Sequence, residues 1–179
     1  MKTLYKFLRF EGDRIKSQNG DFTWGIGKWY KEKEIDLCQS GFHASKEIGQ
    51  AFSYIQGELV ARVSVKGKHE GEDDKEVWSE MKLDKVYKWE KKNSVAISIY
   101  SAELCLENFE KLFPNDKKPR EAIEAANRWI ENPTEENESA AESAWSAARS
   151  AESAAGKKIT KLIYKKFDEE FKTLQEYGK

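Results

Sequence analysis

The chain has little of what would place it in several common functional classes. Its 179 residues include only two cysteines, Cys38 and Cys105, and only two histidines, and these do not form the usual zinc constellation. The 31 basic and 32 acidic side chains nearly cancel, so the chain lacks the basic excess that favours binding to nucleic acid or to a membrane surface. No apolar run approaches the roughly 20 residues of a membrane-spanning helix. We therefore expect no metal site, no membrane segment and no strong nucleic-acid contact.

An apolar leader is also missing. The first residues, MKTLYKFLRFEGDR, lack the uninterrupted apolar stretch of a secretory signal peptide, which predicts a cytoplasmic protein. Thiols stay reduced in that compartment, so we expect Cys38 and Cys105 to be free and unreactive.

The first half of the chain contains aromatic and β-branched runs separated by turn residues. This pattern predicts strands, of which the clearest is residues 59–65 (LVARVSV), with others at residues 3–10, 14–17, 22–31 and 77–89. A short helix is expected from residue 46 to residue 54, because Ser45 suits an N-cap and Ile48, Ala51 and Phe52 follow at helical spacing. Residues 1–90 are thus predicted to form a small mixed β-sheet unit with one short helix.

The second half has helical spacing throughout. Apolar residues and flanking breaks predict four helical segments, at residues 94–113, 120–130, 139–155 and 157–177. The third segment is rich in alanine, and its alanines at positions 140, 144, 147, 151 and 154 follow heptad spacing. Such a seam lets a second helix approach closely, either in the same chain or in another copy of it, and both alternatives stay open. The predicted fold class is therefore α+β, with a helical bundle over residues 91–179 after the sheet unit.

Several segments resemble known sequences. LYKFLR, WGIGKWY, SGFHAS and VARVSVKG, followed by the Asp73-Asp74-Lys75 step, resemble an uncharacterised domain of tailed-phage and prophage proteins. The tract from residue 114 to residue 151 is similar to the Ala- and Trp-rich helical tract of many phage open reading frames and of a bacterial immunity-protein family. This resemblance implies an accessory phage protein in the host cell cytoplasm. Its most concrete form is a non-enzymatic antagonist of a bacterial defence protein, for example an anti-CRISPR, acting by protein–protein contact; a structural phage protein is an alternative.

The segment GFHASKEIGQAFSY also resembles, more distantly, the core of ADP-ribosyltransferase-like folds. That resemblance implies that Arg9, or alternatively Lys6 on the same strand, would hold the ribose of NAD. It also implies that Ser45 or Tyr54 would support the nicotinamide and that Glu76 or Glu80 would orient the nucleophile. No Glu-x-Glu or Gln-x-Glu stands at the head of a predicted strand, so we assign no catalytic residue and no cofactor.

A binding role for the same region is the second hypothesis. In it the sheet unit sequesters a nucleotide or an NAD derivative without turnover. The candidate ligand-binding residues supply charge, stacking and hydrogen bonds, and they are Arg9, Trp24, His43, Ser45 and Tyr54.

Overall fold

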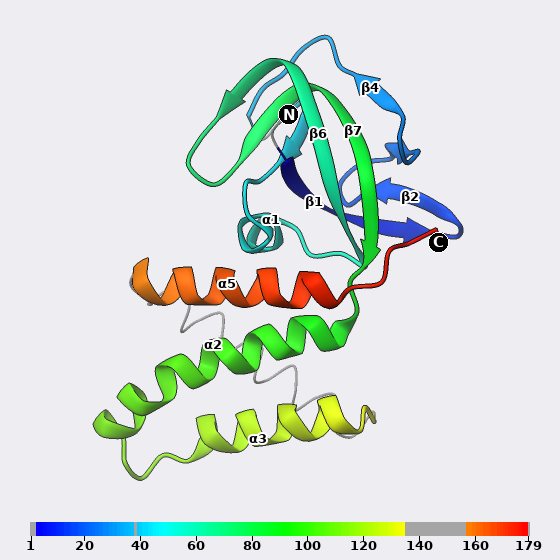
Figure 1. The fold of residues 1–179 in the computed structure, drawn as a ribbon. Coiled ribbons are helices and arrows are strands. Elements are labelled where there is room, and N and C mark those ends of the chain that lie inside the picture. The colour runs from blue at the N-terminus through cyan, green and yellow to red at the C-terminus, as the bar shows by residue number, and fades with distance from the viewer. Residues whose placement is uncertain (1–2, 38, 135–156, 179) are drawn as a thin grey trace. The chain divides into compact units, whose positions relative to one another are not determined.

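The computed structural model describes residues 3–37, 39–134 and 157–178, and the chain in it divides into two compact units. The first unit comprises Met1–Trp89 together with Phe171–Lys179, and the second comprises Glu90–Glu170. The first unit holds the sheet and one helix, and the second is helical (Figure 1). The prediction of an α+β protein is confirmed.

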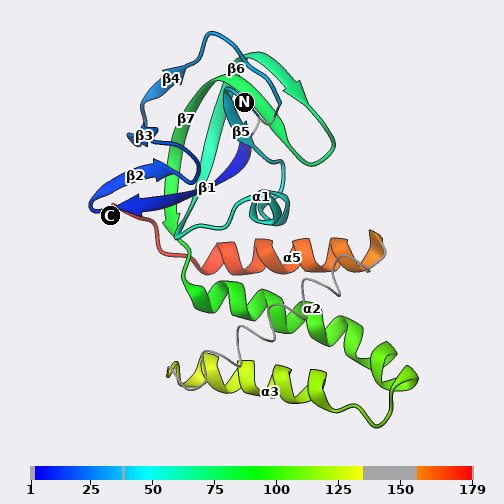
Figure 2. The ribbon, with the colours of Figure 1, turned by 180° about the vertical axis from the view of Figure 1, so that it is seen from behind.

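A seven-stranded antiparallel sheet, curled into a half-barrel, forms the first unit. Its strands follow the order β3-β2-β1-β6-β7-β4, and β5 pairs with β7 outside this path. Figure 2, which shows the molecule from behind, labels the short strands β3 and β5. The bounds are β1 (Thr3–Glu11), β2 (Arg14–Ser17), β3 (Thr23–Trp24), β4 (Trp29–Lys31), β5 (Phe42–Ala44), β6 (Leu59–Gly71) and β7 (Glu76–Lys88).

The expectation of a mixed sheet was wrong. All pairings between the described strands are antiparallel. Short connections join β1 to β2, β2 to β3 and β6 to β7, which suits antiparallel pairing, and the remaining pairs join strands that lie far apart in the chain. The single parallel pairing in the described part of the chain is an isolated bridge between Ile26 and Leu83.

The curl of the sheet brings the end of β5 back to β1. Tyr5 and Ser45 exchange both backbone hydrogen bonds, at 2.8 and 3.0 Å, while β5 pairs with β7 through Phe42, His43 and Ala44. Because β1 also pairs with β6 and β6 with β7, these four segments form a closed circuit of backbone hydrogen bonds. This circuit fixes β5 beside β1, where the candidate site lies.

Alternation along β1 decides which side chains enter the half-barrel. Leu4 and Leu8 are both 0% exposed and belong to the main core, with the interior side chains of β6 and β7. Phe7 points to the opposite face, where its ring packs edge-on against Phe52 and Trp89, each at 5.3 Å between ring centroids. Both faces of β1 are therefore buried at its centre.

Helix α1 (Ile48–Tyr54) buries Ile48, Ala51 and Phe52 against this second face and lies beside β1 in both views (Figures 1 and 2). Its N-cap is Glu47, which forms a capping box with Gln50. The N-cap prediction at Ser45 was wrong, because the backbone of Ser45 is engaged with Tyr5.

The last residues of the chain return to the sheet unit. Tyr177 donates its backbone N–H to Val86 at 2.7 Å, Lys88 donates to Gln175 at 3.1 Å, and Lys85 pairs with Glu176 at 3.0 Å. The sequence analysis assigned these residues to the helical region. Helix α5 (Lys157–Thr173) ends four residues earlier than the predicted segment.

The second unit contains α2 (Lys91–Leu112), α3 (Lys118–Glu131) and most of α5. Helices α2 and α3 pack through a cluster of buried side chains, and Arg120 of α3 forms a two-pronged ion pair with Glu110 of α2 at 2.8 and 2.7 Å. The cluster consists of Val95, Ile99, Ile123, Ala126 and Trp129. The predicted segment at residues 139–155, with its alanine seam, lies outside the described residues, so the bundle and any pairing of copies through the seam stay predictions.

Within the residues that the structure describes, no helix has both the length and the apolar character that crossing a membrane requires.

Gly57, between α1 and β6, provides a test of this packing. A Cβ atom at this position would overlap the carbonyl oxygen of Leu8 and lie 3.0 Å from its carbonyl carbon. We expect Gly57→Ala to lower the free energy of unfolding by about 1–3 kcal/mol, as measured by urea denaturation, because backbone atoms cannot move aside cheaply. The exposed neighbour substitution Gln56→Ala is the control and should change stability little; equal effects would contradict this account.

Candidate ligand-binding pocket

A pocket of about 390 Å³ opens in the sheet unit, between β1, the loop after β2, the segment that contains β5, and α1. This volume is within the range of small-molecule sites. Among the described residues its lining includes two lysines, one histidine, three side-chain amides and several hydroxyls, but no aspartate or glutamate. The lining is therefore rich in hydrogen-bond donors and carries only positive formal charge.

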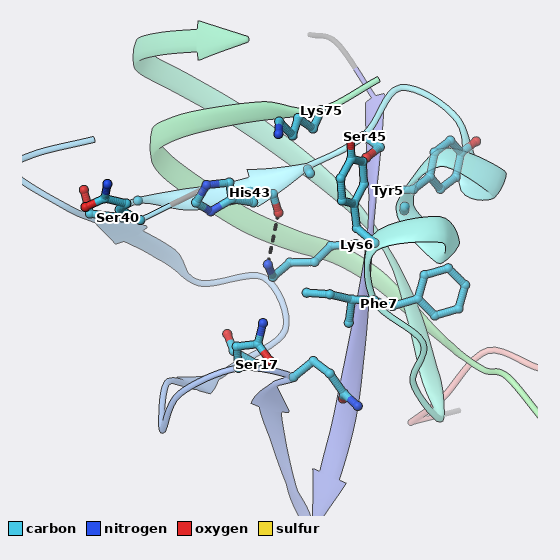
Figure 3. Close-up of a pocket in the computed structure, with 16 residues that line it drawn as sticks. Tyr5, Lys6, Phe7, Ser17, Ser40, His43, Ser45 and Lys75 are labelled. Carbon is cyan, nitrogen blue, oxygen red and sulfur yellow. Dashed lines mark hydrogen bonds between the residues drawn. The ribbon is translucent and has the colours of Figure 1, made fainter. Parts of the chain in front are cut away.

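Lys6 is the central charged group of the pocket. It occupies the position of β1 between Leu4 and Leu8, both fully buried on the interior face, so strand alternation directs its side chain inward. Its Nζ donates a hydrogen bond to the backbone carbonyl of His43 at 3.0 Å and lies 5.9 Å from the centroid of the Trp24 ring. In Figure 3 the Lys6 side chain extends from β1 toward His43.

No carboxylate in the described part of the chain pairs with Lys6, and burial lowers the pKa of its amine from 10.5 to about 8. Lys16 shows the contrasting case. Its Nζ is also buried, but it lies 3.3 Å from Glu11 Oε2 and 3.4 Å from Asp21 Oδ1. Of these two lysines, Lys16 is buried with two carboxylates, whereas the half-buried Lys6 pairs with no carboxylate among the described residues.

His43 lines the pocket from β5, where it pairs with Val77 of β7. Burial, and next the positive charge of Lys6, hold the pKa of its imidazole below the usual value, so the ring is neutral at pH 7. Gly41 makes this placement of β5 feasible. Its φ is +92°, and a Cβ there would lie 2.7 Å from Val77 and 2.9 Å from Ile35.

Tyr54 and Lys75 form the rim of the pocket. The Tyr54 hydroxyl donates to Asp74 Oδ2 at 2.6 Å, and this bond raises the pKa of Tyr54 to about 12. Lys75 Nζ lies 5.3 Å from the centroid of the Tyr54 ring and 3.4 Å from Glu72 Oε2. The rim therefore joins α1 to the tip of the β6–β7 hairpin and offers an aromatic ring, 49% exposed at Tyr54, beside a cation.

Gln18 contributes an acceptor to the lining. Its Oε1 is buried and has no hydrogen-bond partner in the structure as described. A buried polar atom without a partner costs about 1–3 kcal/mol, and a donor group on a bound molecule, or a water, would recover that cost. The lining thus combines cationic groups with a buried acceptor that has no described partner.

Three of the five predicted ligand-binding residues line this pocket, namely His43, Ser45 and Tyr54. The structure places Arg9 and Trp24 elsewhere. The Arg9 guanidinium is held by the Ser17 carbonyl at 3.1 Å and by Glu11 at 3.3 Å. Trp24 is 4% exposed and packs in the core.

The carboxylates that the transferase resemblance would require also lie outside the lining. Glu76 is buried, accepts a hydrogen bond from Trp78 Nε1 at 3.0 Å, and has Lys46 and His69 each at 3.7 Å. Glu80 lies between two lysines of neighbouring strands, at 3.4 Å from each.

The sequence analysis considered Lys6 only as an alternative to Arg9 for the ribose of NAD, and it missed Lys75 and Gln18 as site residues. For Lys6 a signal existed: a lysine stands in the apolar row Leu4, Leu8 and Phe10, on the face of a strand that should be buried. Nothing local marks Gln18 or Lys75, which come to the pocket through the folding of their loops.

Two other candidate chemistries find no support at this site. The described residues contain no group of three or more side chains able to hold a metal ion. Burial raises the pKa of the Cys105 thiol, which keeps it protonated at pH 7, and Cys38 lies outside the described residues.

Buried Lys6 predicts a pH dependence of stability. Between pH 8 and 10.5 the Lys6 amine is protonated in the unfolded chain but mostly neutral in the folded chain. The free energy of unfolding therefore rises with pH across this window, because deprotonation favours the folded state. The free energy of unfolding of the wild type should therefore gain up to about 3 kcal/mol relative to Lys6→Met across this window. Chemical denaturation of both proteins at a series of pH values measures this difference in the free energy of unfolding. Lys68→Met, at an exposed position of β6, should follow the wild type; parallel curves for Lys6→Met would refute the burial of this amine.

Comparison with known proteins finds one family whose model matches the chain. The model of a family described as "Domain of unknown function (DUF7666)" matches residues 5–94. No curated protein and no solved structure matches the chain. The matched residues include every residue of the pocket lining and all strands of the sheet except the first two residues of β1. Since the match covers just over half of the 179 residues, the chain belongs to the family of the Domain of unknown function (DUF7666).

Proposed function

We propose that the sheet unit binds a small anionic molecule of nucleotide size, with Lys6 as its charged anchor. The observation that carries the proposal is the Lys6 ammonium, which lies in a pocket with no acidic lining residue and pairs with no described carboxylate. Burial makes an ammonium in this setting costly, and an anionic group of a ligand would offset that cost.

The remaining lining supports a ligand with more than a charge. Tyr54 offers an exposed ring on which a base or another flat group can stack, and Lys75 adds a second cation at the rim. The buried acceptor of Gln18 favours a molecule that also carries an N–H or O–H donor. A nucleotide or an NAD derivative combines a phosphate, a flat ring and such donors.

This proposal corresponds to the second hypothesis from the sequence. The first, an antagonist of a bacterial defence protein, stays a prediction, as does a structural role in a phage, because no described contact bears on a protein partner.

Isothermal titration calorimetry tests the proposal. The panel is ATP, ADP-ribose, NAD and a cyclic dinucleotide, with uncharged adenosine as the matched ligand control. We expect at least one anionic member to bind and to raise the melting temperature, while adenosine binds far more weakly.

Variants locate the site. Lys6→Met should weaken binding of that ligand about 10-fold or more, Lys6→Arg should keep most of the affinity because it keeps the charge, and Lys68→Met should leave it unchanged. Binding should also weaken as salt rises. The proposal fails if no member of the panel binds, or if Lys6→Met, shown to be folded, binds as well as the wild type.

A further inference from the structure

We propose that Lys6 also captures carbonyl-bearing ligands covalently, by forming an imine between its Nζ and an aldehyde or ketone held in the same pocket. This inference rests on the proposed function, because the same pocket must first admit the ligand. It adds a reaction and a second ligand class, molecules that combine an anionic group with a carbonyl.

The position of the amine carries the inference. Strand alternation directs the Lys6 side chain into the pocket, and the hydrogen bond to the His43 carbonyl at 3.0 Å holds its nitrogen there. In Figure 3 the nitrogen lies between His43 and Ser17, in the midst of the lining residues. A neutral amine can give one N–H to the His43 carbonyl and still keep its second N–H and its lone pair for a ligand.

The surroundings favour the reactive form of the amine. A neighbouring carboxylate would keep Lys6 protonated, and none pairs with it in the described part of the chain. With a pKa of about 8, about a tenth of the amine is neutral at pH 7, compared with about one part in 3,000 for a lysine at 10.5. Desolvation of this kind is a known way to activate a lysine as a nucleophile.

The other lysines near the pocket lack this combination. Lys75 reaches the rim but pairs with Glu72 at 3.4 Å, and Lys16 is buried between the carboxylates of Glu11 and Asp21. Both pairings stabilise the charged ammonium, which is not a nucleophile. Lys6 is thus the pocket lysine whose setting favours attack on a carbonyl.

The reaction balances without a co-reactant. The lone pair of Lys6 Nζ forms a bond to the carbonyl carbon, the π electrons move to the oxygen, and one nitrogen proton transfers to that oxygen to give a carbinolamine. The second nitrogen proton then joins the hydroxyl as the C–O bond breaks. Water leaves, and a C=N bond remains on Lys6.

Pyridoxal 5′-phosphate is a suitable probe, because it carries an aldehyde and a phosphate on one flat ring. The full-length protein is treated with a small excess of the probe, reduced with borohydride and mapped by peptide mass spectrometry. We expect one main adduct on Lys6, formed about 10-fold or more faster than on exposed Lys68. The labelling rate should rise with pH and level off near pH 8 to 9, whereas an ordinary lysine continues to gain reactivity toward pH 10.5.

Lys6→Arg separates this inference from the proposed function. It keeps the positive charge but cannot form an imine, so it should lose the main adduct while it keeps binding of the anionic ligand. If this variant fails to fold, the rate of the adduct on wild-type Lys6 relative to that on Lys68, measured with pyridoxal, tests the inference without requiring an anionic ligand. The inference would be overturned if the label were spread evenly over surface lysines. It would also be overturned if the total labelling of Lys6→Arg equalled that of the wild type.

The two proposals can fail separately. Binding of an anionic ligand without an adduct on Lys6 overturns imine formation alone. An adduct on Lys6 from pyridoxal, which lacks the phosphate, without binding of any anionic ligand overturns the proposed function and leaves the amine chemistry standing.

Discussion

The alternation of side chains along β1 is the constraint on which the pocket depends. Leu4 and Leu8, both 0% exposed, anchor one face of this strand in the core, and a shift of one residue would move them to the opposite face, out of that core. With the register held in this way, Lys6 between them must point into the half-barrel. Two backbone hydrogen bonds between Tyr5 and Ser45 then bring the end of β5 alongside, so that the His43 carbonyl meets the Lys6 amine. The charge of the pocket therefore follows from the same register that builds the core.

An ammonium at this position is a cost to the fold. Where the chain buries Lys16, it supplies Glu11 and Asp21 as partners, as a structural lysine requires. For Lys6 it supplies one carbonyl and, at 5.9 Å, the face of Trp24. A methionine or leucine there would continue the apolar row at no electrostatic cost. A lysine that pairs with no carboxylate among the described residues is a local conflict between sequence and fold, and such conflicts are concentrated at functional sites.

Local patterns could predict the elements but not the way in which they meet. The apolar runs of β1 and β6 and the helical spacing of α2 and α3 were visible in the sequence, since each is long enough to show its period. Strand β5 has only three residues and exists because Phe42 pairs with Trp78, a partner far away in the chain. The same dependence on distant partners explains which site residues were predicted correctly. His43, Ser45 and Tyr54 come from one continuous segment and lie together in the pocket. Arg9 and Trp24 were chosen by residue type alone, and their neighbours in the fold hold them elsewhere. Lys6 required the face of the strand to be considered first.

The segment from Gly41 to Ser45 shows how one short stretch serves both architecture and binding. Gly41 permits close approach to Val77 and Ile35, and Phe42 and Ala44 enter the core. Between them, the backbone of His43 holds Lys6 and the backbone of Ser45 holds Tyr5, while the side chains of both residues line the pocket. The strand pairing uses main-chain atoms of both residues, whereas the His43 imidazole also interacts with the backbone at Gly41 and Asp36. Position 6 differs from both, because there the side chain itself provides the charge of the pocket.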